Sequence, residues 1–171
     1  AQESRGLGDV YKRQPIHVVA LGYKKDEVDF AFDGFGFLYA LNSIRSTIGI
    51  LWDSSIFPRA PEGYALIRLF IGGAMRENVK EMTKEQVIQE AISEVERTMH
   101  IKTPPVFTDV TTCINAIPQY NMEHKEITDY IENLQNIHKG LYLGGNALKG
   151  VGINDCSRSA YELTQEALDK I

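Results

Sequence analysis

The chain has 171 residues, of which 43% are hydrophobic, and a formal net charge of −5. This length allows one domain with its own core, or parts of two. The acidic balance and the lack of a basic cluster argue against a nucleic-acid partner. No apolar run approaches the roughly 20 residues that span a bilayer. The two cysteines, Cys113 and Cys156, do not suggest a secreted disulfide scaffold, so we expect a cytoplasmic protein with reduced thiols.

The first 14 residues differ in character from the rest of the chain. They lack a starting methionine and resemble translated sequencing-adapter text, as found at the ends of assembled metagenomic reading frames. We therefore exclude residues 1–14 from fold reasoning as non-native sequence. We also expect the chain to be a carboxy-terminal fragment of a longer protein.

The pattern that follows is typical of β-strands. The expected strands are residues 16–23, 28–32, 35–39, 44–52 and 64–71. Asp33 and Gly34 favour a tight type I′ turn, which would pair the second of these strands with the third. One face of the fourth strand is expected to carry its alternating apolar residues, Ile44, Ile48, Ile50 and Trp52. A loop stiffened by two prolines, residues 57–63, precedes the last strand.

The second half of the chain alternates helices with strands. Thr83 and Gln86 form a capping-box pattern, and apolar residues then follow at helical spacing to Met99. The acids on the other face of this helix are expected to be solvated: Glu85, Glu90, Glu94 and Glu96. A strand over residues 106–113 and a helix over residues 127–137 come next. The class is mixed α/β or α+β.

A glycine-rich stretch near the carboxy terminus organises the last part of the chain. An apolar strand, residues 141–143, is expected to lead into turns with glycines at positions 144, 145, 150 and 152. A helix is expected to begin near Ile153, with an apolar stripe of Cys156, Ala160, Leu163, Ala167 and Ile171. Glycines allow close approach of a ligand to the backbone, and the free N–H groups of a helix start favour negative charge.

Other chemistry is not indicated by the residues. The four histidines, His17, His100, His124 and His138, lack metal-ligand spacing and are interpreted as surface or satisfied polar residues. No nucleophile elbow and no paired carboxylates stand out. Cys156 is interpreted as a small buried residue. This pattern fits a site at which a bound cofactor carries the reaction.

Five motifs, in order and spacing, resemble one family. They are residues 34–38 (GFGFL), 53–63 (DSSIFPRAPEG), 70–74 (FIGGA), 116–120 (AIPQY) and 150–156 (GVGINDC). Together they resemble the carboxy-terminal third of the oxygen-dependent protoporphyrinogen or coproporphyrinogen oxidases of haem biosynthesis. The family often continues the first motif with a proline and then a glutamate, whereas this chain has residues 39–43 (YALNS) after Leu38.

The resemblance implies a flavoenzyme with an FAD domain and a separate substrate domain. Its FAD would take electrons from protoporphyrinogen IX or coproporphyrinogen III and pass them to O2, giving H2O2. Residues 15–112 would belong to the substrate domain, and residues 113–171 to the FAD domain. A fragment alone is expected to be inactive. The resemblance leaves open the porphyrinogen used, the oligomeric state, and a peripheral contact with a membrane or a haem-pathway enzyme.

Site residues follow from the motifs that match. The resemblance places six residues at FAD: Gly145, Asn146, Gly150, Val151, Gly152 and Ile153. Leu38 and Phe57 would lie along the porphyrinogen pocket, although plain core packing is an alternative for both. Two other functions stay open. One is another flavin amine oxidase-like enzyme or a carotenoid desaturase, and the other is a non-enzymatic module that binds a porphyrin or a partner protein.

Overall fold

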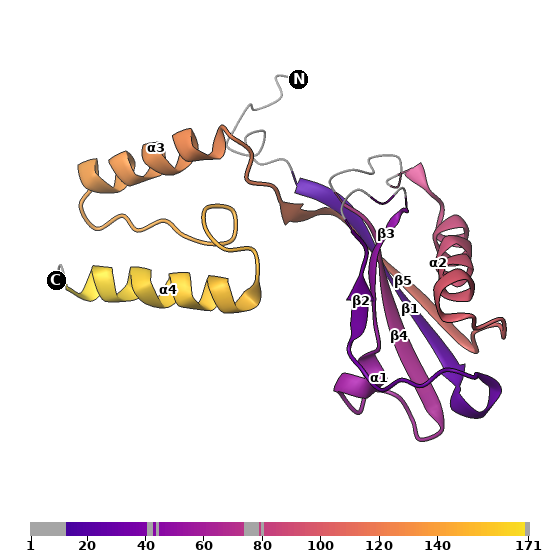
Figure 1. Cartoon of the computed structure of the whole chain (residues 1–171). Helices are drawn as coiled ribbons and strands as arrows, with labels where there is room; N and C mark the ends of the chain where they lie inside the picture. Colours follow the sequence, from indigo (N-terminus) through magenta and orange to yellow (C-terminus); the bar gives the residue numbers. More distant parts are fainter. Residues whose placement is uncertain (1–12, 41–42, 44, 74–78, 80, 170–171) are drawn as a thin grey trace. The chain divides into compact units, whose positions relative to one another are not determined.

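The computed structural model describes residues 13–40, 43, 45–73, 79 and 81–169. The chain divides into two compact units, one of residues 14–116 and one of residues 117–169 with Arg13, and each is described by itself. Within the described ranges, none of the helices combines the length and the apolar character that crossing a membrane requires. The expected mixed α/β class is confirmed (Figure 1).

The described residues form ten elements of secondary structure. They are β1 (Arg13–Lys24), the 3₁₀ turn η2 (Lys25–Glu27), β2 (Gly36–Leu38), β3 (Thr47–Leu51), α1 (Asp53–Ile56), β4 (Tyr64–Gly72), α2 (Lys84–Met99), β5 (Phe107–Pro118), α3 (His124–Ile137) and α4 (Ile153–Leu168). The strands predicted at residues 16–23 and 64–71 are confirmed as β1 and β4. β1 begins at Arg13, so it includes two residues of the segment that we excluded from the fold.

Five strands form one sheet in the order β2-β3-β4-β1-β5. The two central neighbours, β1 and β4, pair antiparallel from Ile16 with Gly72 to Lys24 with Tyr64. Alternate residues of both strands are buried, and α2 packs its apolar stripe against them. The buried cluster consists of Val19, Leu21, Tyr23, Ile50, Ile67, Leu69, Ile71, Val79, Val87, Ala91, Val95, Met99 and Ile101.

The capping box at the start of α2 is confirmed. The Thr83 hydroxyl accepts a hydrogen bond from the Gln86 N–H at 3.3 Å, and the Gln86 side chain accepts one from the Thr83 N–H at 2.8 Å. Glu85 and Glu96 are exposed on the far face, as predicted. The prediction was wrong for Glu94, which is fully buried. Contacts with another part of the chain, which helical spacing does not reveal, hold this carboxylate inside.

The predicted hairpin around Asp33 and Gly34 was also wrong. Residues 28–32 form no strand, and β2 pairs with β3 through Gly36 and Leu51 instead. A type I′ turn needs positive φ at both central residues, and neither Asp33 nor Gly34 has it. The apolar residues before the turn have another role, because Phe30 packs edge-on against Trp52 with ring centroids 5.2 Å apart.

The alternation of buried residues predicted for residues 44–52 is interrupted in β3. Ile50 is fully buried and Trp52 packs against the same core. A register shift between Thr47 and Gly49 makes a bulge in β3, so Ile48 leaves the alternation and is only half-buried. Ile44 lies outside the described residues.

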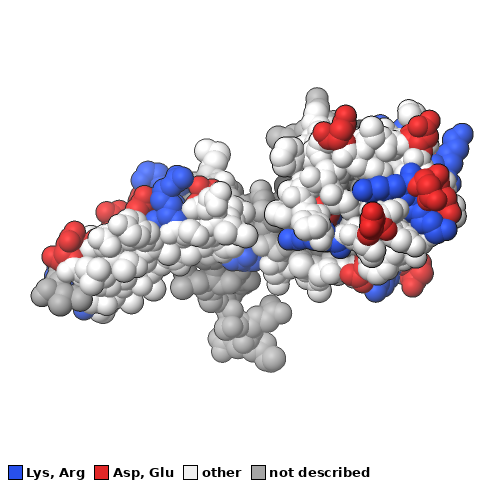
Figure 2. Space-filling view, turned by 90° about the horizontal axis from the view of Figure 1, so that it is seen from below, with Lys and Arg blue, Asp and Glu red and all other residues white. Residues whose placement is uncertain are grey.

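The unit of residues 117–169 buries few side chains. Ile131 is the buried residue of α3, and α4 has no buried residue. Cys156 is half-buried, so the prediction of a buried cysteine was wrong. The described remainder of the predicted stripe is at most half-buried. On the face seen in Figure 2, this unit (at the left) shows a wide uncharged area, with charged side chains mostly along its margins.

Tyr23 allows the core of residues 14–116 to be tested by pH. Burial raises the pKa of its phenol to about 12, against about 10 in an unfolded chain. Between these values the unfolded state has lost a proton that the folded state keeps. The free energy of unfolding therefore falls as pH rises, by about 1.4 kcal/mol per pH unit from this group.

We expect Tyr23→Phe to reduce the measured slope by this amount when the free energy of unfolding is measured with urea at about pH 9, 10 and 11. The slope from Tyr39, whose pKa is also raised to about 12, remains. The control is the same comparison at about pH 8, where the phenol is protonated in both states. Equal slopes for the two proteins above pH 10 would contradict the assignment.

Candidate functional site

The segment between α3 and α4 carries the candidate cofactor residues. Residues 141–143, predicted to be a strand, form none in the structure. A strand needs a neighbour for its backbone hydrogen bonds, and no described strand pairs with this segment. Instead the Leu143 N–H donates to the Gln135 side-chain oxygen at 2.5 Å. The strand prediction is therefore wrong for the chain by itself.

A tight turn around Gly145 follows. Gly145 has a φ of +112°, which a residue with a Cβ rarely adopts, and its carbonyl accepts hydrogen bonds from the N–H groups of Leu148 and Lys149. The neighbouring Asn146 is held at two points. Its carbonyl accepts from the Tyr120 hydroxyl at 2.6 Å, and its side-chain oxygen accepts from Arg13 at 3.1 Å. The turn is therefore fixed by contacts within its own unit.

Gly150 and Gly152 bring the backbone close to the first turn of α4. A Cβ on Gly150 would lie 2.5 Å from the Asp155 Cβ, and one on Gly152 would lie 3.3 Å from an Asp155 carboxylate oxygen. The Cys156 thiol donates to the Gly150 carbonyl at 3.2 Å. Only glycine fits at position 150, where φ is also positive, so these glycines are required by the local structure whether or not a ligand binds.

The amino terminus of α4 is exposed, and the Asp155 carboxylate lies in its first turn. α4 begins at Ile153, as predicted, and its N-cap Gly152 supplies no side-chain hydrogen bond, whereas the Thr83 hydroxyl caps α2. Two apolar side chains flank the site, with Ile153 85% and Val151 42% exposed. Uncapped N–H groups and the helix dipole favour an anionic group. Four of the six candidate cofactor residues lie at this helix start, namely Gly150, Val151, Gly152 and Ile153. The other two, Gly145 and Asn146, lie in the preceding turn.

A cavity of about 520 Å³ lies in the same unit. It is lined by α3, α4 and the segment between them, and Glu132, Glu162, Glu166, Lys139 and Lys149 contribute its charged side chains. Lys149 and Glu162 form an ion pair at 3.1 Å. None of the six candidate cofactor residues lines this cavity, so the structure separates it from the open start of α4.

The two candidate substrate residues lie on the surface of residues 14–116. Leu38, at the end of β2, is 75% exposed, and Phe57, just after α1, is 48% exposed. These exposures exclude the alternative that either residue is plain core. The guanidinium of Arg59 lies over the Phe57 ring, 4.6 Å from its centroid. Both residues are therefore available to a ligand with apolar surface.

The Asp53-Ser54-Ser55 motif fastens α1 to its neighbours. The buried Asp53 carboxylate accepts from Arg68 of β4 at 2.5 Å. The Ser54 hydroxyl accepts from the Leu66 N–H at 2.6 Å, and the Ser55 hydroxyl donates to the Phe32 carbonyl at 2.6 Å. These three residues belong to a motif that carries the resemblance, but their structural role could not be predicted from the sequence, because both the ion pair and the Phe32 contact join distant segments.

The histidines behave as polar residues of the fold. His17 is 2% exposed, and its Nε2–H donates to the Val79 carbonyl at 2.9 Å while its Nδ1 lies 2.9 Å from the Thr112 hydroxyl. Because a carbonyl can only accept, Nε2 carries the proton. The interpretation of His17 as a satisfied polar residue is confirmed. Among the described residues, no three His, Cys, Asp or Glu side chains gather in a way that could hold a metal ion.

Within residues 117–169, an uncapped helix start beside glycine turns is an arrangement suited to a bound cofactor. Over residues 27–168 the chain matches the family of flavin containing amine oxidoreductases. The chain belongs to this family.

Named relatives indicate which members of this family the chain resembles. The coproporphyrinogen III oxidase of Bacillus subtilis (strain 168) is 31% identical over 152 residues, which cover 88% of this chain and 32% of that protein. The chloroplastic protoporphyrinogen oxidase 1 of Spinacia oleracea is 32% identical over 167 residues, covering 91% of this chain and 30% of that protein. The resemblance drawn from the motifs is confirmed, and the chain spans about a third of the length of these relatives.

Solved structures agree on the fold. A crystal structure from Exiguobacterium sp. 255-15, assigned as a protoporphyrinogen oxidase, superimposes with a TM-score of 0.73 at 17% identity, covering 97% of this chain and 38% of that one. Reduced UDP-galactopyranose mutase superimposes with a TM-score of 0.56 at 12% identity, covering 77% of this chain and 28% of that one. At these identities the likeness concerns the fold alone.

The close contact between Gly150 and Asp155 can be tested by substitution. Gly150→Ala should loosen the start of α4 and free the Cys156 thiol, because the new Cβ overlaps Asp155. Gly140→Ala is the matched control, since Gly140 has a φ of +86° and no atom within 4 Å of its built Cβ.

The measurement is the rate at which a thiol reagent modifies Cys156 when Cys113 is replaced by serine. We expect Gly150→Ala to raise this rate about fivefold over Gly140→Ala. Equal rates in the two variants would show that the packing against Asp155 does not hold the helix start.

Proposed function

We propose that this chain is part of a flavin-dependent oxidase that converts protoporphyrinogen IX or coproporphyrinogen III to the porphyrin. O2 would accept the electrons and leave as H2O2. The observation that carries the proposal is the similarity of about nine-tenths of the chain to coproporphyrinogen III oxidase and protoporphyrinogen oxidases. A cytoplasmic location is part of the same proposal.

FAD is the cofactor proposed, and the open start of α4 fits it. Bound FAD would accept electrons from the substrate in successive two-electron steps. The uncapped N–H groups after Gly152 would stabilise negative charge on the bound group. Gly150 and Gly152 would let that group approach the backbone, while Val151 and Ile153 would shield it from water. Gly145 and Asn146 would support this surface through the turn that precedes it.

The substrate surface is proposed at Leu38 and Phe57. A tetrapyrrole is wide and apolar, with carboxylates at its edge, and exposed apolar side chains suit its ring. Arg59, stacked on Phe57, presents a cation beside that surface. In this proposal residues 15–112 belong to the substrate domain, and residues 113–171 belong to the FAD domain.

The sparse packing of residues 117–169 supports membership of a larger domain. α3 and α4 leave large apolar side chains exposed, among them Tyr130, Ile137, Tyr161 and Leu168. The backbone of residues 141–143 has no strand partner among the described residues. Further chain would satisfy both needs, in keeping with relatives three times as long.

Two alternatives give different results in the same experiments. A different oxidoreductase of the family would bind flavin and oxidise an amine or desaturate a carotenoid. A non-enzymatic module would bind a porphyrin without flavin. The exposed apolar surface at Leu38 is compatible with that module. The test must therefore measure flavin binding and substrate oxidation separately.

The test is a chimera in which residues 15–171 replace the matching third of the Bacillus subtilis oxidase. We expect it to purify with FAD and to oxidise one of the two porphyrinogens, measured by porphyrin fluorescence and peroxide release. The matched variant is Gly152→Glu, which puts a carboxylate over the open N–H groups of α4. It should lower flavin affinity about tenfold or more.

Three results would contradict the proposal. Flavin binding with amine or carotenoid turnover, and no porphyrinogen oxidation, would favour another oxidoreductase. Porphyrin binding by a well-folded chimera that takes up no flavin would favour the binding module. Unchanged flavin affinity in Gly152→Glu would remove the start of α4 from the cofactor site.

A further inference from the structure

A buried carboxylate stands among the apolar residues of α2. Val87, Ala91, Val95 and Met99 form the buried stripe of the helix, and Glu94 lies with them at 0% exposure. Burying an ionised carboxylate is costly unless opposite charges and hydrogen bonds compensate. An apolar side chain would serve packing at this position equally well, so the contacts of the carboxylate should explain its presence.

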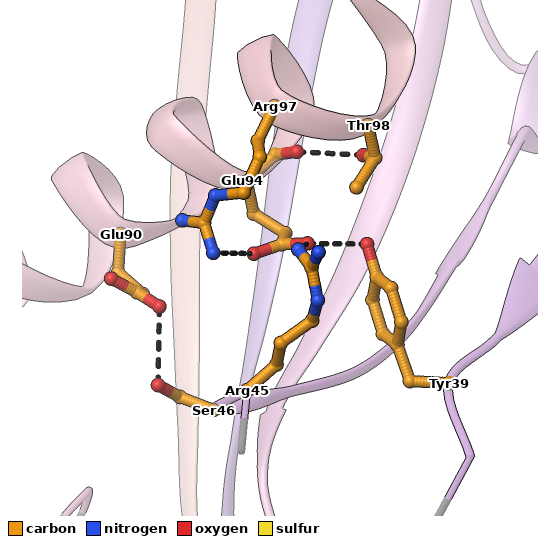
Figure 3. A network of polar contacts seen from close by, with 7 residues as sticks. All are labelled: Tyr39, Arg45, Ser46, Glu90, Glu94, Arg97 and Thr98. Atoms are coloured by element: carbon orange, nitrogen blue, oxygen red, sulfur yellow. Dashed lines mark hydrogen bonds and ion pairs between the residues drawn. The ribbon is translucent and has the colours of Figure 1, made fainter. Parts of the chain in front are cut away.

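Those contacts come mainly from the connection between β2 and β3. One Glu94 oxygen accepts hydrogen bonds from the Tyr39 hydroxyl and from Arg45, the latter at 2.5 Å (Figure 3). The other oxygen forms an ion pair with Arg97 of the same helix at 3.0 Å. Two guanidinium groups and a phenol thus compensate one buried charge. The network fastens the β2–β3 connection to α2.

Tyr39 is held on several sides. The Arg45 guanidinium lies 5.0 Å from the centroid of its ring, and the Phe37 ring meets it edge-on at 5.3 Å. Its backbone N–H donates to the Ile48 carbonyl at 2.8 Å, which continues the pairing of β2 with β3. Burial, assisted by the hydrogen bond to Glu94, raises the pKa of its phenol to about 12. The phenol therefore remains a donor at neutral pH.

The anchored residue directly follows Leu38. β2 has three residues, Gly36–Leu38, lies at the edge of the sheet and pairs with β3 alone. So short an edge strand has few hydrogen bonds of its own. At the other end of β2, the Trp52 N–H donates a hydrogen bond to the Phe35 carbonyl at 2.9 Å. The Glu94 network thus holds Tyr39, the residue directly after the exposed Leu38, from outside the sheet.

We propose that Glu94 is a positioning residue, which acts through Tyr39 to hold the end of β2 so that Leu38 meets an apolar, tetrapyrrole-type ligand. This inference rests on the proposed function for the identity of the ligand. Glu94 touches no part of the ligand surface. Through Tyr39, it sets the position of the Leu38 side chain, which forms one edge of that surface.

The first test follows hydrogen exchange of single amides in the intact chain. Tyr39→Phe and Glu94→Gln should speed exchange at the Tyr39 N–H about tenfold or more and leave the Trp52 N–H unchanged. Ser46→Ala is the matched control, because it removes a hydrogen bond from the same connection to Glu90 of the same helix, at 3.1 Å, and leaves Glu94 untouched. Equal acceleration at Tyr39 and Trp52 would mean general loosening and overturn the proposal. No acceleration at Tyr39 would overturn it as well.

The second test measures binding of coproporphyrin III to the intact chain by quenching of Trp52 fluorescence. We expect Tyr39→Phe and Glu94→Gln to weaken binding about fivefold, while Ser46→Ala binds like the unmodified chain. Equal affinity in all four proteins would overturn the positioning role and leave the proposed function standing. An unmodified chain that binds no porphyrin would contradict the porphyrinogen surface of the proposed function, and this inference would fall with it.

Discussion

The pairing of β1 with β4 is the interaction on which the larger unit depends. It joins residues 16–24 to residues 64–72, and every other strand attaches to one of these two, directly or through β3. The residues between them must close into a loop before any of this burial is gained. The η2 turn, β2, β3 and α1 all lie within that loop, so the elements that carry the candidate substrate surface form around this strand pair.

The two units differ in how much of their apolar surface they bury. Residues 14–116 surround a continuous core, whereas residues 117–169 have one buried side chain in their helices, Ile131. An amphipathic helix gains most of its stability from the surface that it packs against. The sequence of α4 therefore suits a partner surface that this unit does not supply. The start of α4 is exposed as well, with Ile153 85% accessible and no side-chain cap from Gly152.

Features set by neighbouring residues could be predicted from the sequence. The capping box of Thr83, the run of β1 and the start of α4 at Ile153 depend on residues a few positions apart. The glycine turns also followed from local rules. The residues proposed for the cofactor come from motifs, and residues 150–153 among them lie at the start of α4.

Features set by distant partners could not be predicted. The choice of β3 as the neighbour of β2 depends on backbone pairing between Gly36 and Leu51. The burial of Glu94 depends on Tyr39 and Arg45. A glutamate on a helix is usually solvated, and no spacing rule links position 94 to position 39. The same holds for residues 141–143, whose apolar run predicts a strand only if a partner strand is present.

The three hydrogen-bonding residues of α1 affect how a sequence of this kind can be assigned to a family and a substrate. Asp53, Ser54 and Ser55 each contact a different backbone or side chain, and none of these contacts reaches the proposed ligand surface. A motif built in this way is a marker of the scaffold, and relatives that share the scaffold can carry it whatever their substrates. Assignment of substrate within this family should therefore weight the exposed positions 38 and 57 above the motif between them.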